Sequence, residues 1–470
     1  MNREPLNGRY LDNVEPATGR VYSLLPDSDA SDLALAVASA EKALPAWKAL
    51  GAESRARMLY AIADVIERRL EELARAESID NGKPLSIARI LDIPRAATNF
   101  RFFAAAATQF ASESHSVGHE AINYTLRDPV GIVGCISPWN LPLYLFTWKI
   151  APALAAGNCV IGKPSEITPM TAFLLGEICN EAGLPRGVLN IVHGRGSSIG
   201  HALVTHPKVK AISFTGGTAT GVAIAALAGP QFKKLSLEMG GKNPTLVFAD
   251  CDYETTVEGT VRAAFANQGE ICLCGSRILI ERSIYNRFRD DFVSQVSALK
   301  VGDPLDNETQ QGALVSETHM EKVLSYIELA RSTGGSVLAG GYRATVPGRC
   351  AEGYFVHPTV IEGLSAECRV NQEEIFGPVA TLIPFDTDTE AVSMANSVRY
   401  GLAASVWSSD IKRCHRVARE LESGVVWVNC WMMRDLRTPF GGMKDSGVGR
   451  EGGQEAMRFF TEPKNVCIRY

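Results

Sequence analysis

Two runs of alternating strand-like and helix-like segments constrain the fold of this chain more than any other feature. The first run starts at Gly131 and the second follows Gly240. Parallel strands need a crossover connection, and a helix usually makes it, so the alternation predicts an α/β architecture. We therefore expect two α/β lobes that meet near Gly240.

Hydrophobic periodicity places individual elements inside this outline. The first of three N-terminal helices is expected to end at Pro45, because proline interrupts helical hydrogen bonding. Segments 124–127 and 465–470 alternate like exposed strands, which another subunit could pair. The expected helices cover 31–44, 55–76, 92–107, 171–182, 221–228, 253–267, 284–299, 317–332 and 389–398, and the expected strands cover 131–137, 187–193, 211–215, 245–249, 276–280, 354–361, 379–385, 403–407 and 424–429.

Composition excludes several classes of protein. A length of 470 residues suggests roughly three domains. A net charge of −5 without a long basic run argues against nucleic acid or an anionic membrane as a partner. Residues 1–10 lack a signal-peptide core, and prolines break the most apolar window, 130–161. The eleven cysteines have neither disulfide-framework nor zinc-finger spacing, which predicts reduced thiols, a cytoplasmic location and no metal site.

Two motifs supply a nucleophile and a base. The sequence Phe-Ala-Asn-Gln-Gly-Glu-Ile-Cys ends at Cys272, and Leu-Glu-Met-Gly-Gly-Lys-Asn-Pro places Glu238 upstream of it. A thiolate can attack a carbonyl carbon, and a carboxylate can later activate water against the product. Cys274 is a second candidate thiol, and spacing alone does not choose between the two. A buried structural cysteine and a surface glutamate are the alternatives.

Three further motifs follow strands of the first lobe. Asn140 could donate its amide to an oxyanion, or cap a turn. Lys163 and Glu166 could bind a ribose diol, or lie in a solvated loop. Gly216 and Gly217 join a strand to a helix and could let the backbone approach a pyrophosphate, although their spacing differs from the usual dinucleotide fingerprint.

Taken together and in order, the motifs resemble those of the aldehyde dehydrogenase superfamily. The resemblance runs from near Gly131 to Arg450. It implies an aldehyde dehydrogenase-like α/β fold, with a Rossmann-like NAD-binding domain (1–111 and 130–239) and an α/β catalytic domain (240–441). A small β oligomerisation arm with the C-terminal segment (112–129 and 442–470) implies a homodimer or homotetramer. The matching motifs are Ser137–Asn140, Lys163–Glu166, Phe214–Gly217, Leu237–Pro244, Phe265–Arg277, Glu373–Pro378 and Pro439–Gly442.

The resemblance also assigns catalytic roles. Cys272 attacks the aldehyde carbon, while the Asn140 amide and the Cys272 backbone N–H stabilise the oxyanion. Hydride then leaves for the nicotinamide, and Glu238 activates the water that hydrolyses the thioester. Lys149 and Glu451 match positions of a proton relay. A base at Glu238 favours hydrolysis over transfer to coenzyme A.

The implied cofactor is NAD. Lys163 and Glu166 match adenosine-ribose contacts, Glu374 matches a nicotinamide-ribose contact, and Phe376 packs near the nicotinamide. A carboxylate at Glu166 would repel the 2′-phosphate of NADP. Gly217 replaces a serine that is common at this position of the family. The cofactor-binding residues implied are Ile136, Ser137, Pro138, Trp139, Lys163, Ser165, Glu166, Gly196, Phe214, Thr215, Gly216, Gly217, Glu374 and Phe376.

Segments 92–103 and 429–437 narrow the substrate class. Both resemble the 2-aminomuconic and 2-hydroxymuconic semialdehyde dehydrogenases of aromatic-ring and tryptophan (kynurenine) catabolism. Their substrates carry an aldehyde at one end and a carboxylate at the other. A broad-specificity enzyme, or one for another semialdehyde, is the alternative.

A guanidinium binds a carboxylate through two parallel hydrogen bonds, so arginines are the expected substrate contacts. Arg95 and Arg434 are predicted to clamp the carboxylate beside Tyr144, with Arg437 or Arg101 in reserve. The alternative is that the two predicted arginines form inter-domain ion pairs, for instance with Asp92 or Asp435.

Overall fold

The first alternating run forms a six-stranded sheet in the computed structural model, which describes residues 3–470. The strand order is β19-β9-β8-β5-β6-β7, and all neighbours are parallel except β19 and β9. The chain winds outward from β5 in both directions, so the order reverses between β5 and β8, where α/β folds place ligands. The strands are β5 (Ile132–Ile136), β6 (Cys159–Lys163), β7 (Leu189–Ile191), β8 (Val209–Thr215), β9 (Lys234–Glu238) and β19 (Gly447–Val448).

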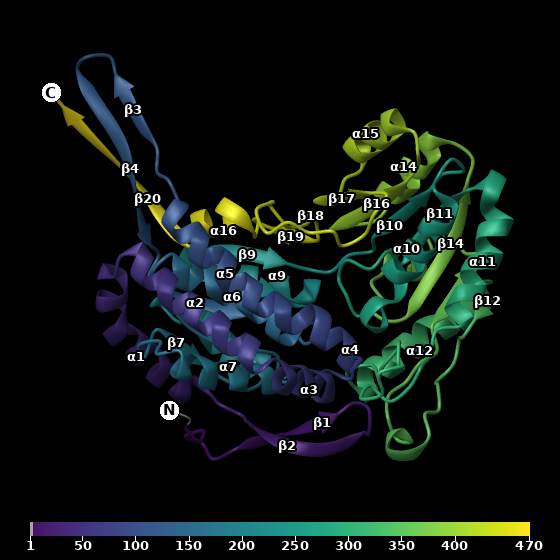
Figure 1. Ribbon diagram of the computed structural model, residues 1–470, viewed down its shortest axis with the longest axis horizontal. Helices are drawn as coiled ribbons and strands as arrows, with labels where there is room; N and C mark the ends of the chain where they lie inside the picture. Colours follow the sequence, from purple (N-terminus) through teal and green to yellow (C-terminus); the bar gives the residue numbers. More distant parts are fainter. Residues whose placement is uncertain (1–2) are drawn as a thin grey trace.

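Helices cover this first sheet, with α2, α3 and α5 in front of it in Figure 1. Their apolar faces join the sheet in the largest core cluster of the chain. The helices are α1 (Ala30–Ala49), α2 (Ala52–Arg68), α3 (Leu70–Asn81), α4 (Leu85–Ile87), the π-helix η1 (Ala88–Asp92), α5 (Ile93–Gln109), α6 (Pro142–Ala155), α7 (Met170–Glu181), α8 (His201–Thr205), α9 (Thr218–Ala228) and α16 (Gly453–Phe459). A hairpin of β1 (Tyr10–Glu15) and β2 (Arg20–Pro26) precedes them.

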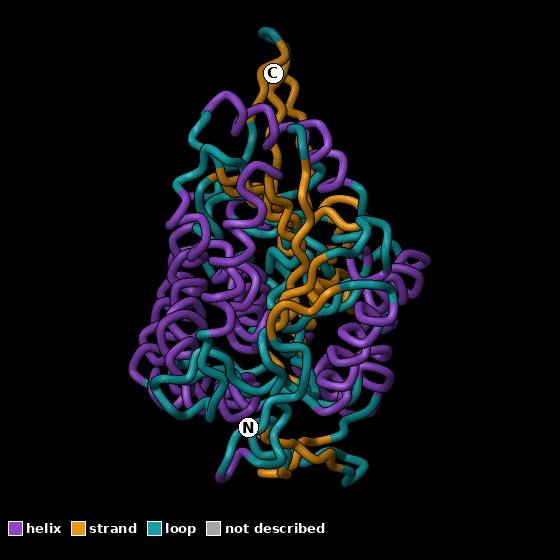
Figure 2. The backbone as a smooth tube through the Cα atoms, turned by 90° about the vertical axis from the view of Figure 1, so that its right-hand side faces the viewer, coloured by secondary structure: helices purple, strands orange, loops and turns teal. Residues whose placement is uncertain are grey.

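The second run forms a seven-stranded sheet in the order β12-β13-β14-β11-β10-β16-β17, parallel except at its β12 edge. Figure 2 views the molecule from the side of this lobe and shows the strands of the whole chain with helices to either side. The strands are β10 (Pro244–Val247), β11 (Arg277–Glu281), β12 (Ser336–Ala339), β13 (Thr359–Glu362), β14 (Val379–Phe385), β16 (Ala403–Trp407) and β17 (Val425–Val428). The helices are α10 (Tyr253–Phe265), α11 (Tyr285–Ser297), α12 (Glu317–Ser332), α13 (Arg369–Gln372), α14 (Asp388–Asn396) and α15 (Ile411–Glu420), and a short ladder joins β15 (Tyr400–Gly401) to β18 (Met443–Lys444).

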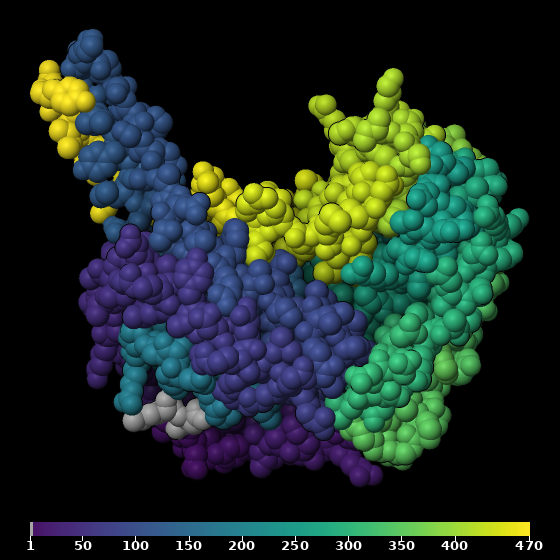
Figure 3. All heavy atoms as spheres, viewed as in Figure 1, coloured from purple at the N-terminus to yellow at the C-terminus, as the bar shows by residue number. Residues whose placement is uncertain are grey.

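A three-stranded arm projects from the body in Figures 1 and 3, with the C-terminus near its tip. It consists of β3 (Ser114–Val117), β4 (Ala121–Pro129) and β20 (Thr461–Arg469). β4 and β20 pair from Thr461–Pro129 to Arg469–Ala121, so the two segments expected to need another subunit pair with each other inside one chain. The outer edges of β3 and β20 are left without a strand partner among residues 3–470.

Several expected boundaries were wrong, each for a physical reason. Pro45 does not end α1, because the helix continues to bury Trp47 at 2% exposure. The expected helix 55–76 is two helices, which separate at Arg69, where φ is −96° and ψ is 20°. Only the end of segment 354–361 is a strand. α6 was missed because all of its residues are buried, which leaves no polar face for periodicity to detect.

The fold class is confirmed as α/β with largely parallel sheets. β9 ends the first sheet at Glu238 and β10 begins the second at Pro244. The division into three domains stays a prediction, and β19, from the C-terminal segment, belongs to the first sheet. Among the described helices, none has both the length and the apolar composition needed to cross a membrane.

Candidate active site

Cys272 lies where two cavities adjoin. The larger, about 440 Å³, is here called the Glu238 cavity and is also lined by Tyr144, Arg434 and Phe440. The smaller, about 300 Å³, is here called the Glu374 cavity and is also lined by Phe376 and Cys274. Cys272 and its neighbour Ile271 line both, so a group bound in either cavity reaches the same thiol.

The loop that carries Cys272 is held by a left-handed turn. After α10, Asn267 and Gln268 adopt φ values of 52° and 55°, and Gly269 follows at 71°. A Cβ on Gly269 would lie 2.1 Å from the carbonyl oxygen of Gly377, so this position requires glycine. Non-glycine residues rarely adopt positive φ, and such strain is typical of functional sites. The turn therefore fixes the thiol against the segment that carries Glu374 and Phe376.

The two candidate thiols differ in what they face. Cys272 is half-buried and lines both cavities, whereas Cys274 is buried and its thiol faces the Ala266 carbonyl oxygen at 3.9 Å. Burial raises the pKa of the Cys272 thiol, Glu374 and Glu238 raise it further, and the charge of Arg434 opposes them. The thiol is therefore neutral at rest and needs a base before it can attack.

Glu238 ends β9 and faces the Glu238 cavity together with Cys272. Its carboxylate is buried, and neither oxygen has a hydrogen-bond partner among residues 3–470. Burial raises its pKa well above the usual range, and the charge of Glu451 adds to this, while Lys149, Arg450 and Arg434 lower it. A buried carboxyl with raised pKa and no fixed partner is suited to exchange protons with a bound molecule.

The predicted relay residues meet behind Glu238. The Lys149 ammonium donates to Glu451 Oε1 at 2.6 Å, in a pair whose side chains are 0% and 8% exposed. Ser213 joins them, because its hydroxyl donates to the same Glu451 oxygen at 3.2 Å and accepts from Lys149 at 3.3 Å. Glu451 also lines the Glu238 cavity, so the cluster reaches the candidate base.

Asn140 is buried behind the Cys272 loop. Its side-chain amide donates to the Glu270 carbonyl oxygen at 2.8 Å, two residues before Cys272. It is not among the described residues that line either cavity. The structure therefore ties Asn140 to the nucleophile loop, and its role as an oxyanion donor stays a prediction.

Of the two predicted substrate arginines, Arg434 lines the Glu238 cavity, and Arg95 lies behind two aromatic residues of its wall without lining it. Arg434 donates to the Tyr144 hydroxyl at 3.3 Å and stacks over the Phe440 ring at 3.9 Å. Arg95 lies over the rings of Tyr144 and Trp148 at 5.2 and 5.7 Å. Burial lowers the pKa of Arg95, and the charge of Arg434 lowers it further, so the two guanidinium groups repel each other at short range.

Neither guanidinium has a carboxylate partner within the described part of the chain. Arg95 donates Nε to Asn99 at 3.2 Å, and its buried Nη2 has no partner among residues 3–470. The alternative of ion pairs with Asp92 or Asp435 is wrong, because Asp92 pairs with Lys83 and Asp435 with Arg437.

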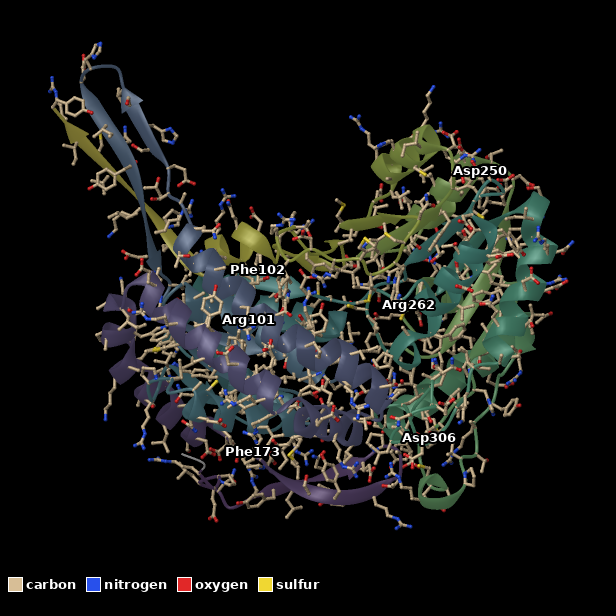
Figure 4. All side chains as sticks on the ribbon, in the orientation of Figure 1. Arg101, Phe102, Phe173, Asp250, Arg262 and Asp306 are labelled. Atoms are coloured by element: carbon tan, nitrogen blue, oxygen red, sulfur yellow. The ribbon has the colours of Figure 1, made fainter. Side chains whose placement is uncertain are left out.

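The two reserve arginines are held elsewhere. Arg437 is exposed in its pair with Asp435. Arg101 binds Asp64 and Glu67 on the outer face of α5, where Figure 4 labels it. Neither lines the cavities that contain Cys272.

The predicted cofactor residues gather at the carboxyl ends of β5, β6 and β8. Lys163 donates to Glu166 at 2.8 Å, and Gly196 holds the other Glu166 oxygen through its backbone N–H at 3.0 Å. Burial works to raise the pKa of Glu166, but the Lys163 charge and these hydrogen bonds lower it overall, which keeps a carboxylate at this edge. Ser165 is buried beside them, and its hydroxyl accepts from the Ile167 N–H.

The strand ends also leave polar atoms without partners. The hydroxyls of Ser137 and Thr215 are buried and unpaired among residues 3–470. Gly217 caps α9 with no side-chain hydrogen bond, and a Cβ there would meet nothing within 4 Å. Unpaired donors around an open helix N-terminus fit a pyrophosphate. The other residues predicted here, Ile136, Pro138, Phe214 and Gly216, adjoin these atoms in sequence.

Glu374 and Phe376, the two predicted cofactor residues of the second lobe, line the Glu374 cavity. Glu374 accepts from the Gly241 N–H at 2.9 Å. Phe376 has a φ of 63°, and its carbonyl oxygen lies 2.6 Å from His319 Nε2. Its ring meets that of Trp139 edge-on at 5.2 Å, which links the β5 loop to the Glu374 cavity.

Sequence reasoning missed several residues of the site. Ser213 and Trp148 stand outside the motifs named above, whereas Glu270 and Phe440 stand inside two of them without having been given a role. Asn99 lies within the segment used to infer the substrate class, one helical turn after Arg95, and that spacing is the one signal that could have found it.

The fold places a thiol and a carboxyl group together, next to strand ends that suit a dinucleotide. These features define an oxidoreductase that uses a nucleotide cofactor and a cysteine nucleophile. The Aldehyde dehydrogenase family matches residues 4–466, and the chain belongs to this family. The predicted family and class of enzyme are therefore confirmed.

Individual relatives are similar along nearly their whole length. The 2-aminomuconic semialdehyde dehydrogenase of Mus musculus is 52% identical over 98% of this chain and 95% of its own. The 2-hydroxymuconic semialdehyde dehydrogenase of Pseudomonas sp. (strain CF600) is 46% identical over 98% and 96%. A crystal structure of PnpE in complex with nicotinamide adenine dinucleotide superimposes with a TM-score of 0.97 at 41% identity, covering 100% of this chain and 96% of PnpE.

Proposed function

We propose that this chain oxidises a carboxylate-bearing semialdehyde, 2-aminomuconate or 2-hydroxymuconate 6-semialdehyde, to the dicarboxylic acid with NAD. The observation that carries the proposal is the pair Arg434, which lines the Glu238 cavity, and Arg95, which packs on the cavity residues Tyr144 and Trp148; neither has a carboxylate partner in the described residues. Two unpaired cations at one wall of a half-buried cavity repel each other, and an anionic substrate group relieves that repulsion.

The residues present divide the chemistry among them. The Cys272 thiol loses its proton to solvent, and the sulfur bonds to the aldehyde carbon to give a thiohemiacetal oxyanion. NAD would be held by Lys163, Glu166, Glu374 and Phe376, and when bound it would accept the hydride that leaves this carbon. The thioester that remains on Cys272 is attacked by water, whose proton passes to Glu238. The carboxylic acid leaves, and the Cys272 thiolate that is released takes up a proton from solvent to restore the thiol.

The relay cluster returns that proton to solvent. Lys149, Ser213 and Glu451 are hydrogen-bonded to one another, and Glu451 lines the same cavity as Glu238. Once Glu238 holds a proton, it cannot accept another. It must therefore pass that proton to a neighbouring group before it can act as a base again.

The comparisons support the same substrate class. Relatives named for 2-aminomuconic and 2-hydroxymuconic semialdehydes match over nearly the full chain. A relative from Escherichia coli named for 5-carboxymethyl-2-hydroxymuconate semialdehyde is 44% identical over 94% of this chain. The alternative is therefore a different semialdehyde that also carries a carboxylate, or a broad aldehyde specificity.

The test compares anionic and neutral aldehydes. Purified enzyme is given freshly generated 2-aminomuconate and 2-hydroxymuconate semialdehydes, or hexanal, and NADH formation is followed. Each charge-assisted hydrogen bond contributes about 1.5–3 kcal/mol, so Arg434→Ala should raise KM for the muconic substrates by roughly 10–100-fold. KM for hexanal should change little.

Arg437→Ala is the matched control, because Arg437 lies in the same loop but is exposed and paired with Asp435. It should leave both substrates unaffected. Equal losses on muconic substrate and hexanal in Arg434→Ala would contradict the carboxylate clamp while leaving the aldehyde dehydrogenase class intact.

The projecting arm supports a homodimer or homotetramer, because β3 and β20 present open edges and the sheet has little core of its own. We expect light scattering to give twice or four times the mass of one chain. A monomer would contradict this part of the proposal. All eleven cysteines are free thiols, which fits the reducing cytoplasm.

A further inference from the structure

The backbone of Asn140 is held as tightly as its side chain. Its carbonyl oxygen accepts from the Lys83 ammonium at 3.0 Å and from the Asn267 amide at 3.3 Å. The preceding carbonyl, of Trp139, accepts from Asn81 at 2.9 Å. Donors from the segment Asn81–Lys83 thus hold the peptide groups on either side of the Asn140 Cα, which fixes where its side chain leaves the backbone, and the amide itself donates to the Glu270 carbonyl oxygen.

The ammonium that holds this carbonyl is itself fixed by a buried ion pair. Lys83 donates to Asp92, and both side chains are 0% exposed. Burial raises the pKa of the neighbouring Glu77 to about 8, an effect that Asp92 adds to and Lys83 opposes, so Glu77 is largely protonated at neutral pH. Burial also raises the pKa of Asp92, and the charge and hydrogen bond of Lys83 oppose this.

The backbone next to Lys83 is closely packed at Gly82. Gly82 adopts a φ of 89°, and a Cβ there would lie 2.7 Å from the Ala313 carbonyl oxygen. Asp92 closes the π-helix η1, directly before α5, which carries Arg95. π-turns inside helices are frequent at functional sites. The ion pair therefore connects the start of α5, which carries Arg95, to the loop that carries Asn140.

We propose that Lys83, fixed by Asp92, is a positioning residue that sets the orientation of the Asn140 amide toward the oxyanion. The inference rests on the proposed role of Asn140. A buried ion pair is weak evidence for stability, because desolvation offsets most of its attraction, so a geometric role accounts better for charges at this place. Misplacement of a catalytic donor by about 1 Å can cost on the order of 10²-fold in rate.

The test uses acylation of Cys272 by p-nitrophenyl acetate without NAD. This step forms a tetrahedral oxyanion and releases p-nitrophenolate, which is read from its absorbance. Asn140→Ala should slow it by roughly 10²–10³-fold. Lys83→Met should slow it by about tenfold or more without weakening binding of the ester, because the donor is displaced and the pocket is unchanged.

A double-mutant cycle separates positioning from general damage. If Lys83 acts through Asn140, Asn140→Ala should cost at least about tenfold less in the Lys83→Met background than in the native chain. Additive losses would overturn the positioning role. No effect of Asn140→Ala by itself would instead overturn the proposed role of Asn140.

Two control variants test whether a slower reaction only reflects damage to the fold. Lys83→Met with Asp92→Asn removes both charges, so no lone anion is buried, and it should show the same slow acylation. Lys233→Met is the matched control, because the Lys233 ammonium is also buried and donates to the carbonyls of Val204 and His206 at 2.5 and 2.7 Å. An equal rate loss in Lys233→Met at an equal change in Tm would overturn the inference.

Discussion

The Lys149 ammonium lies 2.6 Å from a carboxylate oxygen of Glu451, although 302 positions separate the two residues in the chain. The pair connects α6 with the segment before α16, and it lies next to the candidate base. Glu451 raises the pKa of Glu238 and Lys149 lowers it, so the two residues act on the same proton in opposite directions.

Substitutions in this pair should move the pH profile of thioester hydrolysis in opposite directions. Lys149→Met removes a charge that favours the Glu238 carboxylate, so the rising limb should move to higher pH by roughly one unit. Glu451→Gln removes a charge that opposes it, so the limb should move to lower pH. The measurement is the steady-state rate from pH 5 to 9, and the double substitution should restore the native midpoint. Shifts in the same direction would exclude this electrostatic account.

Glu238→Gln should separate the two halves of the reaction. Gln cannot take a proton from water, so one equivalent of NADH should form and turnover should then fall by roughly 10²–10⁴-fold. Mass spectrometry of the quenched enzyme should find an acyl group on Cys272. Normal steady turnover would rule out Glu238 as the water base.

The same substitution should stabilise the fold in a pH-dependent way. Burial raises the pKa of Glu238 in the folded chain above its unfolded value. The native protein therefore loses stability as pH rises from the unfolded pKa toward the folded one, and Gln does not. Calorimetry should find a higher Tm for Glu238→Gln at pH 8 and a smaller difference at pH 5. A difference that does not grow with pH would argue against a raised pKa.

The two cysteines should respond differently to removal. Cys272→Ala should abolish NADH formation, whereas Cys274→Ala should keep activity within about threefold, because Cys274 faces the Ala266 carbonyl oxygen. Since burial raises the Cys272 pKa, iodoacetamide should alkylate it slowly at pH 7 and about tenfold faster per pH unit above. Equal behaviour of the two variants would refute the assignment of the nucleophile.

Cofactor choice should depend on Glu166. Its carboxylate is held between Lys163 and Gly196, and Glu166→Ala should raise kcat/KM for NADP by about tenfold or more, because the repulsion of a 2′-phosphate is removed. Glu181→Ala, a surface carboxylate on α7, serves as the control. Unchanged discrimination between NAD and NADP in Glu166→Ala would contradict the role.

Much of the site could be predicted because its residues stand in local motifs. Cys272, Glu238 and Glu374 can each be predicted from the residues next to them in the sequence. The structure places the three around adjoining cavities. Ser213 could not be found this way, and Glu270 lies inside the Cys272 motif, which gives no sign of its contact to Asn140. Their importance comes from contacts to Glu451 and Asn140, which are distant in the chain.

The sequence by itself determined the α/β alternation, the candidate nucleophile and base, and the arginines, because hydrophobic periodicity and side-chain chemistry are local properties. Tertiary structure decided the rest. It removed Arg101 and Arg437 from the site by pairing them at the surface, and left Arg95 and Arg434 without carboxylates among residues 3–470. It also paired β4 with β20 and joined Lys83 to Asn140. Such contacts depend on which groups burial brings together, and burial is settled only when the whole chain packs.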